Sequence, residues 1–560
     1  MKGNNTNVRR SLIELQREYE QNQSNELEKL VTAWAYIKSL PADDPNSFFV
    51  IGGYHGEPFL GEGAKNQEWW GGYCNHANVL FPTWHRVYIY RLEKALQTAP
   101  GCEDVMLCYW DQTDEYSTTY GIPRVLTDQY FTFKNAVPQC LIDQKIACNG
   151  NTIANPLASF TLPVAIDDLV AGNDSDYSKP IGYTTVRYPL SGLVGTPQAQ
   201  KETEAHNVIF SDYNTNVAIL NANVLQWLNN KIYYVPGASP AIPPGTMIPA
   251  GIAQAYKNCL EAPNYNAFSN TQSAAYYSSD PGSPQIVPLE EPHNDIHLSI
   301  GGFNLPNNVN NGGPDFSQIP DANADMGEND TAGLDPIFYF HHCNVDRMFW
   351  IWQQKHGCTD HFDIIADSND PGTSTGYNSA NGQGPANGQL ENEILTMQTA
   401  LKPFMKSGTD YYTSEDCINI ESQLDYTYTV GSLSPDKMTA VMEKDAIIKK
   451  SDLKLHLSDF SRGGIDGSFI VAAYATVGQQ KYLIGYHSAL SRWHVGGCAN
   501  CLAHLSVPAT FSLNHYTEEQ ARGMSYHVEI IGREKRNKDR FGKFRALAAT
   551  DYKPYKLEVK

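Results

Sequence analysis

The chain contains DPIFYFHHCNVD at residues 335–346. This stretch opens a segment rich in apolar and aromatic residues, 335–355, whose spacing predicts a helix. His342 lies inside the predicted helix, and Asp346 follows it at i+4. A carboxylate at that spacing is placed to hydrogen-bond a metal-binding imidazole or a neighbouring arginine.

A second stretch, EPHNDIH at residues 291–297, carries two further histidines. His293 and His297 are four residues apart, so on a helix they share one face about one turn apart. Two imidazoles at this spacing suit one metal ion, and His342 can supply the third ligand.

A third group of histidines lies near the N-terminus. His76 and His85 stand in YCNHANVLFPTWHRVYIYRLE, and His55 stands in GGYHGEPF. Residues 84–97 have helical spacing, so we expect His85 to open a helix. Three neutral imidazoles can hold a copper ion and leave room for an exogenous ligand.

Two sets of three histidines without a carboxylate limit the choice of metal. Di-iron and di-manganese sites need bridging Glu or Asp ligands. Zinc would suit a single three-histidine site, whereas two such sites side by side suit a pair of copper ions.

The motif H-x4-F-P-x-W-H-R…E over residues 76–93 and the motif D-P-x-F-x3-H-x3-D over residues 335–346 resemble the two copper signatures of the tyrosinase, catechol oxidase and molluscan haemocyanin family, the type-3 copper proteins. The resemblance covers about residues 8–430 and is strongest to fungal-type pro-tyrosinases that carry a C-terminal lid. It implies a mainly α catalytic core, with a four-helix bundle around a di-copper site and long loops.

The resemblance also implies the ligands. His341 is then a structural neighbour of a ligand, and His206 is not a ligand because it lacks a partner at i+4. The implied ligand sets are His55, His76 and His85 for the first copper, and His293, His297 and His342 for the second.

The implied reaction uses dioxygen as co-substrate to hydroxylate monophenols at the ortho position and to oxidise o-diphenols to o-quinones. Similar enzymes activate the incoming phenol with a water held by a Glu and an Asn. Glu290 and Asn294 match these positions and favour a tyrosinase over an enzyme that acts only as a catechol oxidase. The alternative role for Glu290 is to stabilise the first turn of its helix.

Three other residues have expected roles near the copper pair. By resemblance, Cys74 is joined to His76 through a thioether; the alternative is a free buried thiol. Phe81 and Phe338 each lie four residues before a ligand and are expected to shield the metal pocket, although core packing alone would also explain them.

Helical spacing also runs through residues 8–40, and a helix is predicted near residues 201–230. Residues 140–290 and 367–390 have the composition of long loops. Tyr426-Thr-Tyr428 resembles the mark that closes the catalytic domain in this family, and Arg9 or Arg10 is expected to pack against it.

After residue 430 the sequence changes to alternating, strand-like segments at 468–477, 481–490, 504–513 and 526–533. We therefore predict a catalytic domain over 1–434 and an all-β, sandwich-like domain over 435–560. In many relatives such a domain covers the copper pocket and makes a latent proenzyme, which an activating protease would open. The candidate plugs are Phe460, Tyr486 and Trp493.

The predicted lid also contains Cys498 and Cys501 in a C-x-x-C pattern. Soft thiolates suit Cu(I), and fungal relatives carry such a pair that is proposed to deliver copper. A disulfide, a thiol-redox motif or a purely structural use is the alternative.

The bulk composition excludes several partners. The formal net charge is −20, which repels nucleic acid, and the basic run Arg533–Arg545 is best explained as solvated surface. The sequence contains no run of 18 apolar residues that would predict a membrane span, and no signal peptide is visible. We therefore expect a cytoplasmic protein, and its expected substrates are small phenols.

A homo-oligomer is possible, and the sequence does not determine the oligomeric state. A haemocyanin-like oxygen carrier is the alternative to an enzyme, and a related o-aminophenol oxidase would use the same site.

Overall fold

The structure is a computed structural model. It describes residues 7–56, 72–167, 177–235, 246–305, 319, 322–376, 389–433, 451–465, 467–492, 499–532, 546–548 and 555–560. Helices dominate the described chain up to residue 433. Their bounds are α1 Leu12–Glu20, α2 Glu26–Ser39, α3 Phe48–Gly53, α4 Phe81–Leu96, α5 Glu115–Tyr120, α6 Gln139–Asp143, α7 Pro197–Ile209, α8 Tyr213–Asn229, α9 Ile252–Cys259, α10 Tyr265–Ser269, α11 Thr271–Ser279, α12 Glu290–Gly301, α13 Ile337–His356 and α14 Ile420–Gln423.

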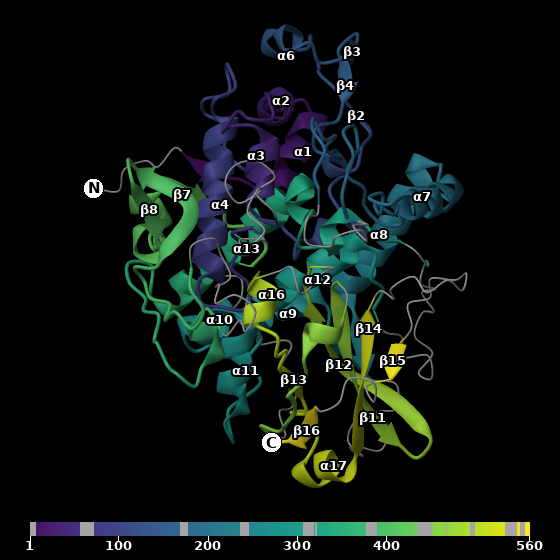
Figure 1. Cartoon of the computed structure of the whole chain (residues 1–560), viewed down its shortest axis with the longest axis vertical. Helices are drawn as coiled ribbons and strands as arrows, with labels where there is room; N and C mark the ends of the chain where they lie inside the picture. The colour runs from purple at the N-terminus through teal and green to yellow at the C-terminus, as the bar shows by residue number, and fades with distance from the viewer. Residues whose placement is uncertain are drawn as a thin grey trace.

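Helix α13 packs against both α4 and α12, and α2 packs against α4; the four helices are labelled in Figure 1. The ring of Trp34 in α2 stacks on Phe340 of α13 with 5.5 Å between ring centroids. Helix α13 begins directly after Pro336 and ends at His356; the next residue, Gly357, has a left-handed φ of 66° that suits glycine at a helix C-terminus. The central helices are therefore fixed by buried aromatic packing and by local stop signals.

The structure corrects three sequence-based boundaries. Residues 8–40 form a short strand and two helices instead of one helical run, and residues 201–230 are divided between α7 and α8. The Asp212 side chain accepts a hydrogen bond from Thr215 N, which starts α8 as a separate helix. Helix α4 begins at Phe81, with a proline in its first turn, so His85 lies in its second turn and does not open it.

Small sheets occur throughout the described chain. Before residue 433 the strands are β1 Val8–Arg9 with β9 Thr427–Tyr428, β2 Tyr130–Thr132 with β4 Thr152–Ala154 and β3 Cys148–Asn149, β5 Lys231–Tyr233 with β6 Met247–Pro249, and β7 Ala400–Ser407 with β8 Asp410–Thr413. The parallel pair β1–β9 joins the start of the described chain to the Tyr426–Tyr428 segment.

Two antiparallel sheets follow residue 451 and lie together at one end of the molecule (Figure 1). One has the order β12-β11-β14-β15 and the other the order β13-β10-β16. The strand bounds are β10 Lys454–Ser458, β11 Phe469–Val477, β12 Gln480–Ala489, β13 Ala509–Ser512, β14 Ser525–Gly532, β15 Ala546–Ala548 and β16 Lys556–Val559. The expected domain boundary at 434/435 lies outside the described residues.

One predicted strand is shorter than expected. Of residues 504–513 only Ala509–Ser512 form a strand, β13, and the short helices α16 (Ala499–Ala503) and α17 (Glu518–Gly523) flank it. Pro508 immediately precedes β13 and cannot donate a backbone hydrogen bond to a sheet, which explains why the strand starts after it.

A cluster of buried charged side chains joins the start of the described chain to α4, α13 and the Tyr426–Tyr428 segment. Arg9 pairs with Glu93 at 2.8 Å, and its guanidinium lies 3.6 Å from the ring centroid of Tyr426. Asp346 accepts from Arg86 Nε at 2.5 Å and from Tyr428 OH at 2.5 Å. Of the two candidate arginines, Arg9 therefore packs against the Tyr-x-Tyr segment. Arg10 pairs instead with Glu18 and Glu26.

Among the helices that the structure describes, none combines the length and the apolar character that crossing a membrane requires.

Candidate metal centre

His55, His76 and His85 form the first histidine cluster. His55 follows α3, His76 lies in the loop before α4, and His85 lies on α4. One ring nitrogen from each lies within 4.8 Å of the others, and all three side chains are buried. Residues that are separated in sequence therefore converge on one point.

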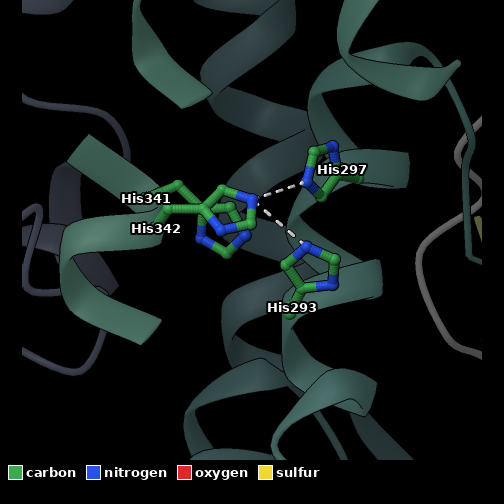
Figure 2. A group of neighbouring side chains, drawn as sticks. All are labelled: His293, His297, His341 and His342. Carbon is green, nitrogen blue, oxygen red and sulfur yellow. Dashed lines mark hydrogen bonds between the residues drawn. The ribbon is translucent and has the colours of Figure 1, made fainter. Parts of the chain in front are cut away.

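The second cluster is built by two helices. Helix α12 carries His293 and His297, and α13 carries His342 (Figure 2). His342 Nε2 lies 3.2 Å from His293 Nε2 and 3.3 Å from His297 Nε2. The three nitrogen atoms therefore point at one another, and all three side chains are 0% exposed.

The two clusters lie side by side. The rings of His85 and His342 stack with 4.6 Å between centroids, and those of His76 and His293 lie 5.6 Å apart. Each pair takes one histidine from each cluster. The arrangement suits two metal ions that share one exogenous ligand.

Backbone carbonyl groups select the tautomer of three imidazoles. The Nδ1 atoms of His55, His85 and His297 lie 3.1, 2.8 and 2.9 Å from the carbonyl oxygens of Asn329, Phe81 and Met326. A carbonyl only accepts, so each Nδ1 carries the proton and donates it. The Nε2 lone pairs then face the cluster centres, as metal ligation requires.

The donor set fits copper. The Nε2 atoms of His55, His76 and His85 are buried and have no hydrogen-bond partner among the described residues. Buried polar atoms are normally paired, so three unpaired imidazole nitrogens that converge on one point suit a bound metal ion. Burial lowers the pKa of His85 to about 3 and that of His297 to about 4, which keeps both rings neutral and able to bind metal.

His341 lies beside the second cluster and has a ring nitrogen within 4.8 Å of the other three histidines (Figure 2). Gln112 Nε2 donates to its Nδ1 at 2.9 Å. The Gln112 amide is itself oriented, because its Oε1 accepts from Tyr256 OH at 2.7 Å. The proton of a neutral His341 is then on Nε2, which cannot bind a metal. This hydrogen bond favours His342 as the third ligand.

Glu290 begins α12, but its carboxylate reaches other segments. Oε1 accepts from Ala77 N at 2.8 Å, and Oε2 accepts from Thr271 N at 2.9 Å and from Thr271 Oγ1 at 3.1 Å. Because Ala77 follows His76 directly, Glu290 ties the helix of the second cluster to the loop of the first. Burial raises the pKa of Glu290, and the positive charge of Arg462 opposes that effect.

Asn294 connects the second cluster to the C-terminal strands. Its Oδ1 lies 2.9 Å from His293 Nδ1, which donates to it, and its Nδ2 donates to Ser488 O at 3.0 Å. Asn294 therefore orients one imidazole while it is itself held by β12.

Phe81 and Phe338 both lie against the imidazoles. Phe338 stacks on His342 with 3.9 Å between centroids and lies 4.8 Å from His55. Phe81 lies 4.7 Å from His85 and 4.8 Å from His293. Each phenylalanine thus contacts at least one histidine of each cluster.

Cys74 is buried and carries a free thiol in the structure. The Asn329 amide nitrogen donates to its Sγ at 3.4 Å. Burial raises the pKa of this thiol to about 12.

Of the candidate plug residues, Phe460 and Tyr486 are described. Phe460 packs on Phe469 with 5.9 Å between ring centroids. Tyr486 donates to Ala250 O at 3.0 Å, and its ring meets the edge of Trp227, so its described contacts are with the α8–α9 region. Trp493 lies outside the described residues.

The remaining predicted residues lie elsewhere. Cys501 is disulfide-bonded, and Cys498 lies outside the described residues. His206 donates through Nε2 to Pro189 O at 2.8 Å and is no part of either cluster. The basic run at 533–545 also lies outside the described residues.

Sequence reasoning missed the residues of β12 that contact α12. His487 pairs with Glu291 at 2.7 Å, and Ser488 Oγ donates to Asp295 Oδ1 at 2.6 Å. Burial alone would lower the pKa of His487, but the Glu291 carboxylate raises it. Only the alternating pattern of β12 was visible in the sequence, because these contacts join positions almost 200 residues apart.

A cavity of about 880 Å³ lies between α9, α12 and the C-terminal strands, with Gln254, Ile286, Gly485 and Phe511 in its wall. Among the residues described along its wall, none belongs to either histidine cluster. The imidazoles therefore lie apart from this space.

Comparisons with known proteins agree with the two clusters. The family model described as the common central domain of tyrosinase matches residues 45–355, more than half of the chain. A tyrosinase of Hahella sp. is 44% identical over 94% of this chain and 91% of its own length, and a tyrosinase of Aspergillus oryzae is 39% identical over 90% and 89%. The solved tyrosinase of Burkholderia thailandensis at low pH has a TM-score of 0.78 at 44% identity, covering 99% of this chain and 100% of that one.

The fold and the paired histidine clusters define a type-3 copper phenol oxidase. The chain belongs to the tyrosinase family and is an oxidoreductase of the tyrosinase and polyphenol oxidase class. The family implies a binuclear copper site, dioxygen as co-substrate and small phenols as substrates.

Proposed function

We propose that this enzyme is a true tyrosinase, which hydroxylates monophenols as well as oxidising o-diphenols, and that residues 435–560 keep it latent. The observation that carries the proposal is the pair of adjacent three-histidine clusters, with Glu290 and Asn294 on one helix beside them. Two copper ions held by the six histidines would supply dioxygen binding and the oxidising power for both reactions.

The protein's own task in monophenol hydroxylation is to remove the phenol proton, because a phenol has a pKa near 10. Glu290 and Asn294 are i, i+4 on α12 and therefore share one face. A carboxylate offers about four acceptor sites, and three described donors use three of them at Glu290. The Asn294 amide has a second hydrogen beyond the one given to Ser488. One acceptor and one donor thus remain to hold a water as the proton carrier.

The case for latency rests on the contacts of β12 with α12. Ser488 contacts both Asn294 and Asp295, and His487 pairs with Glu291. These contacts cover the face of α12 next to Glu290, and the six imidazoles are at most 6% exposed. A substrate needs this side of the helix to open, so displacement of the C-terminal strands should raise activity.

We also propose a thioether between Cys74 and His76. The bond would fix the ring of His76, whose Nε2 has no hydrogen-bond partner among the described residues. Its formation breaks the Cys74 S–H bond and a ring C–H bond of His76, and it releases two protons and two electrons that dioxygen accepts. Mass spectrometry of the peptide that contains both residues should show the loss of two hydrogen atoms after copper loading in air. An unchanged mass would contradict the thioether.

Oxygen uptake tests the proposed activity. The copper-loaded chain is assayed on L-tyrosine and L-DOPA before and after limited proteolysis within residues 434–450. We expect both substrates to react and both rates to rise after the cut. Oxidation of L-DOPA alone would make the enzyme a catechol oxidase, and rates that do not change after cleavage would contradict latency.

A further inference from the structure

The turn formed by Asn329 and Asp330 lies between the first histidine cluster and the C-terminal strands. The Asn329 carbonyl oxygen accepts from His55 Nδ1 at 3.1 Å, and the Asn329 side-chain amide donates to Cys74 Sγ at 3.4 Å. Both Asn329 and Asp330 are 4% exposed. One residue thus contacts a predicted copper ligand through its backbone and the predicted thioether cysteine through its side chain.

The turn is packed too tightly against His55 to move independently. A Cβ on Gly56 would lie 2.3 Å from the carbonyl oxygen of Asp330 and 2.6 Å from that of Asn329. A Cβ on Gly333 would lie 3.0 Å from His55 Cβ. Because the backbones are in direct contact, a shift of the turn must move His55.

The residues that hold the other side of the turn come from the segment after β12. The Asn329 N–H donates to Ser491 O at 3.2 Å. Arg492 Nε lies 2.9 Å from Asp330 Oδ1, and the side chains of this ion pair are 0% and 5% exposed. Ser491 is itself tied to the end of the sheet, because its N–H donates to Ser468 Oγ at 2.9 Å.

The same part of the chain reaches the second cluster. Ser488, only three residues before Ser491, accepts from Asn294, whose Oδ1 in turn orients His293. Residues 488–492 therefore contact the groups that orient one histidine of each cluster.

We infer that Ser491 and Arg492 are positioning residues for the first copper: they hold the Asn329–Asp330 turn, which orients His55 and Cys74. The segment that follows β12 is then part of the structure that retains the metal, whereas the contacts of β12 itself with α12 cover it. This inference rests on the proposed copper site. Changing partners that orient metal ligands typically lowers metal affinity by about 10- to 100-fold.

The test compares three full-length variants loaded with copper: Arg492→Gln, Arg492→Lys and the control Lys481→Gln. Lys481 lies on β12 and forms an ion pair with Glu529 of β14, so both partners belong to the C-terminal sheet. The measurement is the rate at which reduced copper passes to a colorimetric Cu(I) chelator, with far-ultraviolet circular dichroism as the check on folding.

We expect Arg492→Gln to speed release of one of the two copper ions by roughly 10-fold, with the other unchanged. The copper-release rate of Arg492→Lys should fall between those of Arg492→Gln and the wild type, because lysine keeps the positive charge but its shorter side chain contacts Asp330 less well. If Arg492→Gln does not fold, Arg492→Lys carries the test. Release from a folded Arg492 variant at the rate of Lys481→Gln would overturn the inference. A wild-type chain that binds no copper would instead contradict the proposed function.

Discussion

The imidazole rings of His85 and His342 stack with their centroids 4.6 Å apart and their planes inclined by 20°. His85 belongs to the first cluster and His342 to the second. This contact brings two separately built metal sites together at the crossing of α4 and α13. Helices α4 and α13 must therefore stay in register, and buried polar side chains on both helices hold them together.

Asp346 of α13 links the two helices by pairing with Arg86 of α4. Its carboxylate accepts hydrogen bonds from Arg86, Tyr426 and Tyr428. The guanidinium of Arg9 also lies 3.3 Å from Asp346 Oδ2. Asp346→Asn leaves the buried Arg86 guanidinium without its countercharge and leaves Arg9 with Glu93 alone, so we expect the free energy of unfolding to fall by about 3–5 kcal/mol. Urea denaturation followed by circular dichroism measures the loss.

The matched control is Asp459→Asn. Asp459 pairs with Lys556 at 2.8 Å, but their side chains are 52% and 67% exposed. A pair in water contributes little, so the control should change stability by less than about 1 kcal/mol. Equal losses in the two variants would contradict the central role of the buried cluster.

The Asp346 cluster also predicts a pH dependence. Burial alone would raise the pKa of Asp346, but Arg86 and Arg9 outweigh it, and the folded-state pKa is lowered. A lowered folded pKa means that the stabilisation is complete above the unfolded pKa of about 3.9 and is lost as the pH falls through the folded value. The stability difference between wild type and Asp346→Asn should therefore stay constant near neutral pH and shrink below about pH 4. A difference that shrinks toward alkaline pH would contradict this assignment.

Glu290→Gln tests the proton-transfer role. The amide keeps the shape of the side chain but removes the carboxylate that we propose to hold the water. We expect the rate of L-tyrosine hydroxylation to fall by about 100-fold or more, with a much smaller effect on L-DOPA. Glu261→Gln is the control, because Glu261 forms a partly exposed pair with Lys355. An equal loss on both substrates would show that Glu290 has only a structural role.

Phe338→Leu separates shielding from packing. Phe338 stacks on His342, whereas Phe349, on the same helix and equally buried, packs on Phe268. Phe338→Leu and Phe349→Leu should each lower the free energy of unfolding by at least about 1 kcal/mol. Only Phe338→Leu should also speed copper loss to a chelator. If both variants retain copper equally, Phe338 acts through core packing alone.

The sequence predicted the parts of the site that local spacing determines. His293 and His297 are one turn apart because α12 is helical, and the apolar pattern around His342 located α13. Contacts between distant segments were not predictable. Gln112 fixes His341 from 229 positions away, and Asn329 reaches Cys74 across 255. Helix ends were missed where a single cap, such as Asp212, interrupts a longer periodic pattern.

The copper content of the purified chain tests the central claim most directly. Metal analysis compares the wild type with His342→Ala and with His341→Ala, the adjacent histidine whose Nδ1 accepts from Gln112. The account predicts two copper ions per chain in the wild type and in His341→Ala, and one in His342→Ala. A wild-type chain that binds a single ion, or an ion lost from His341→Ala and kept in His342→Ala, would contradict it.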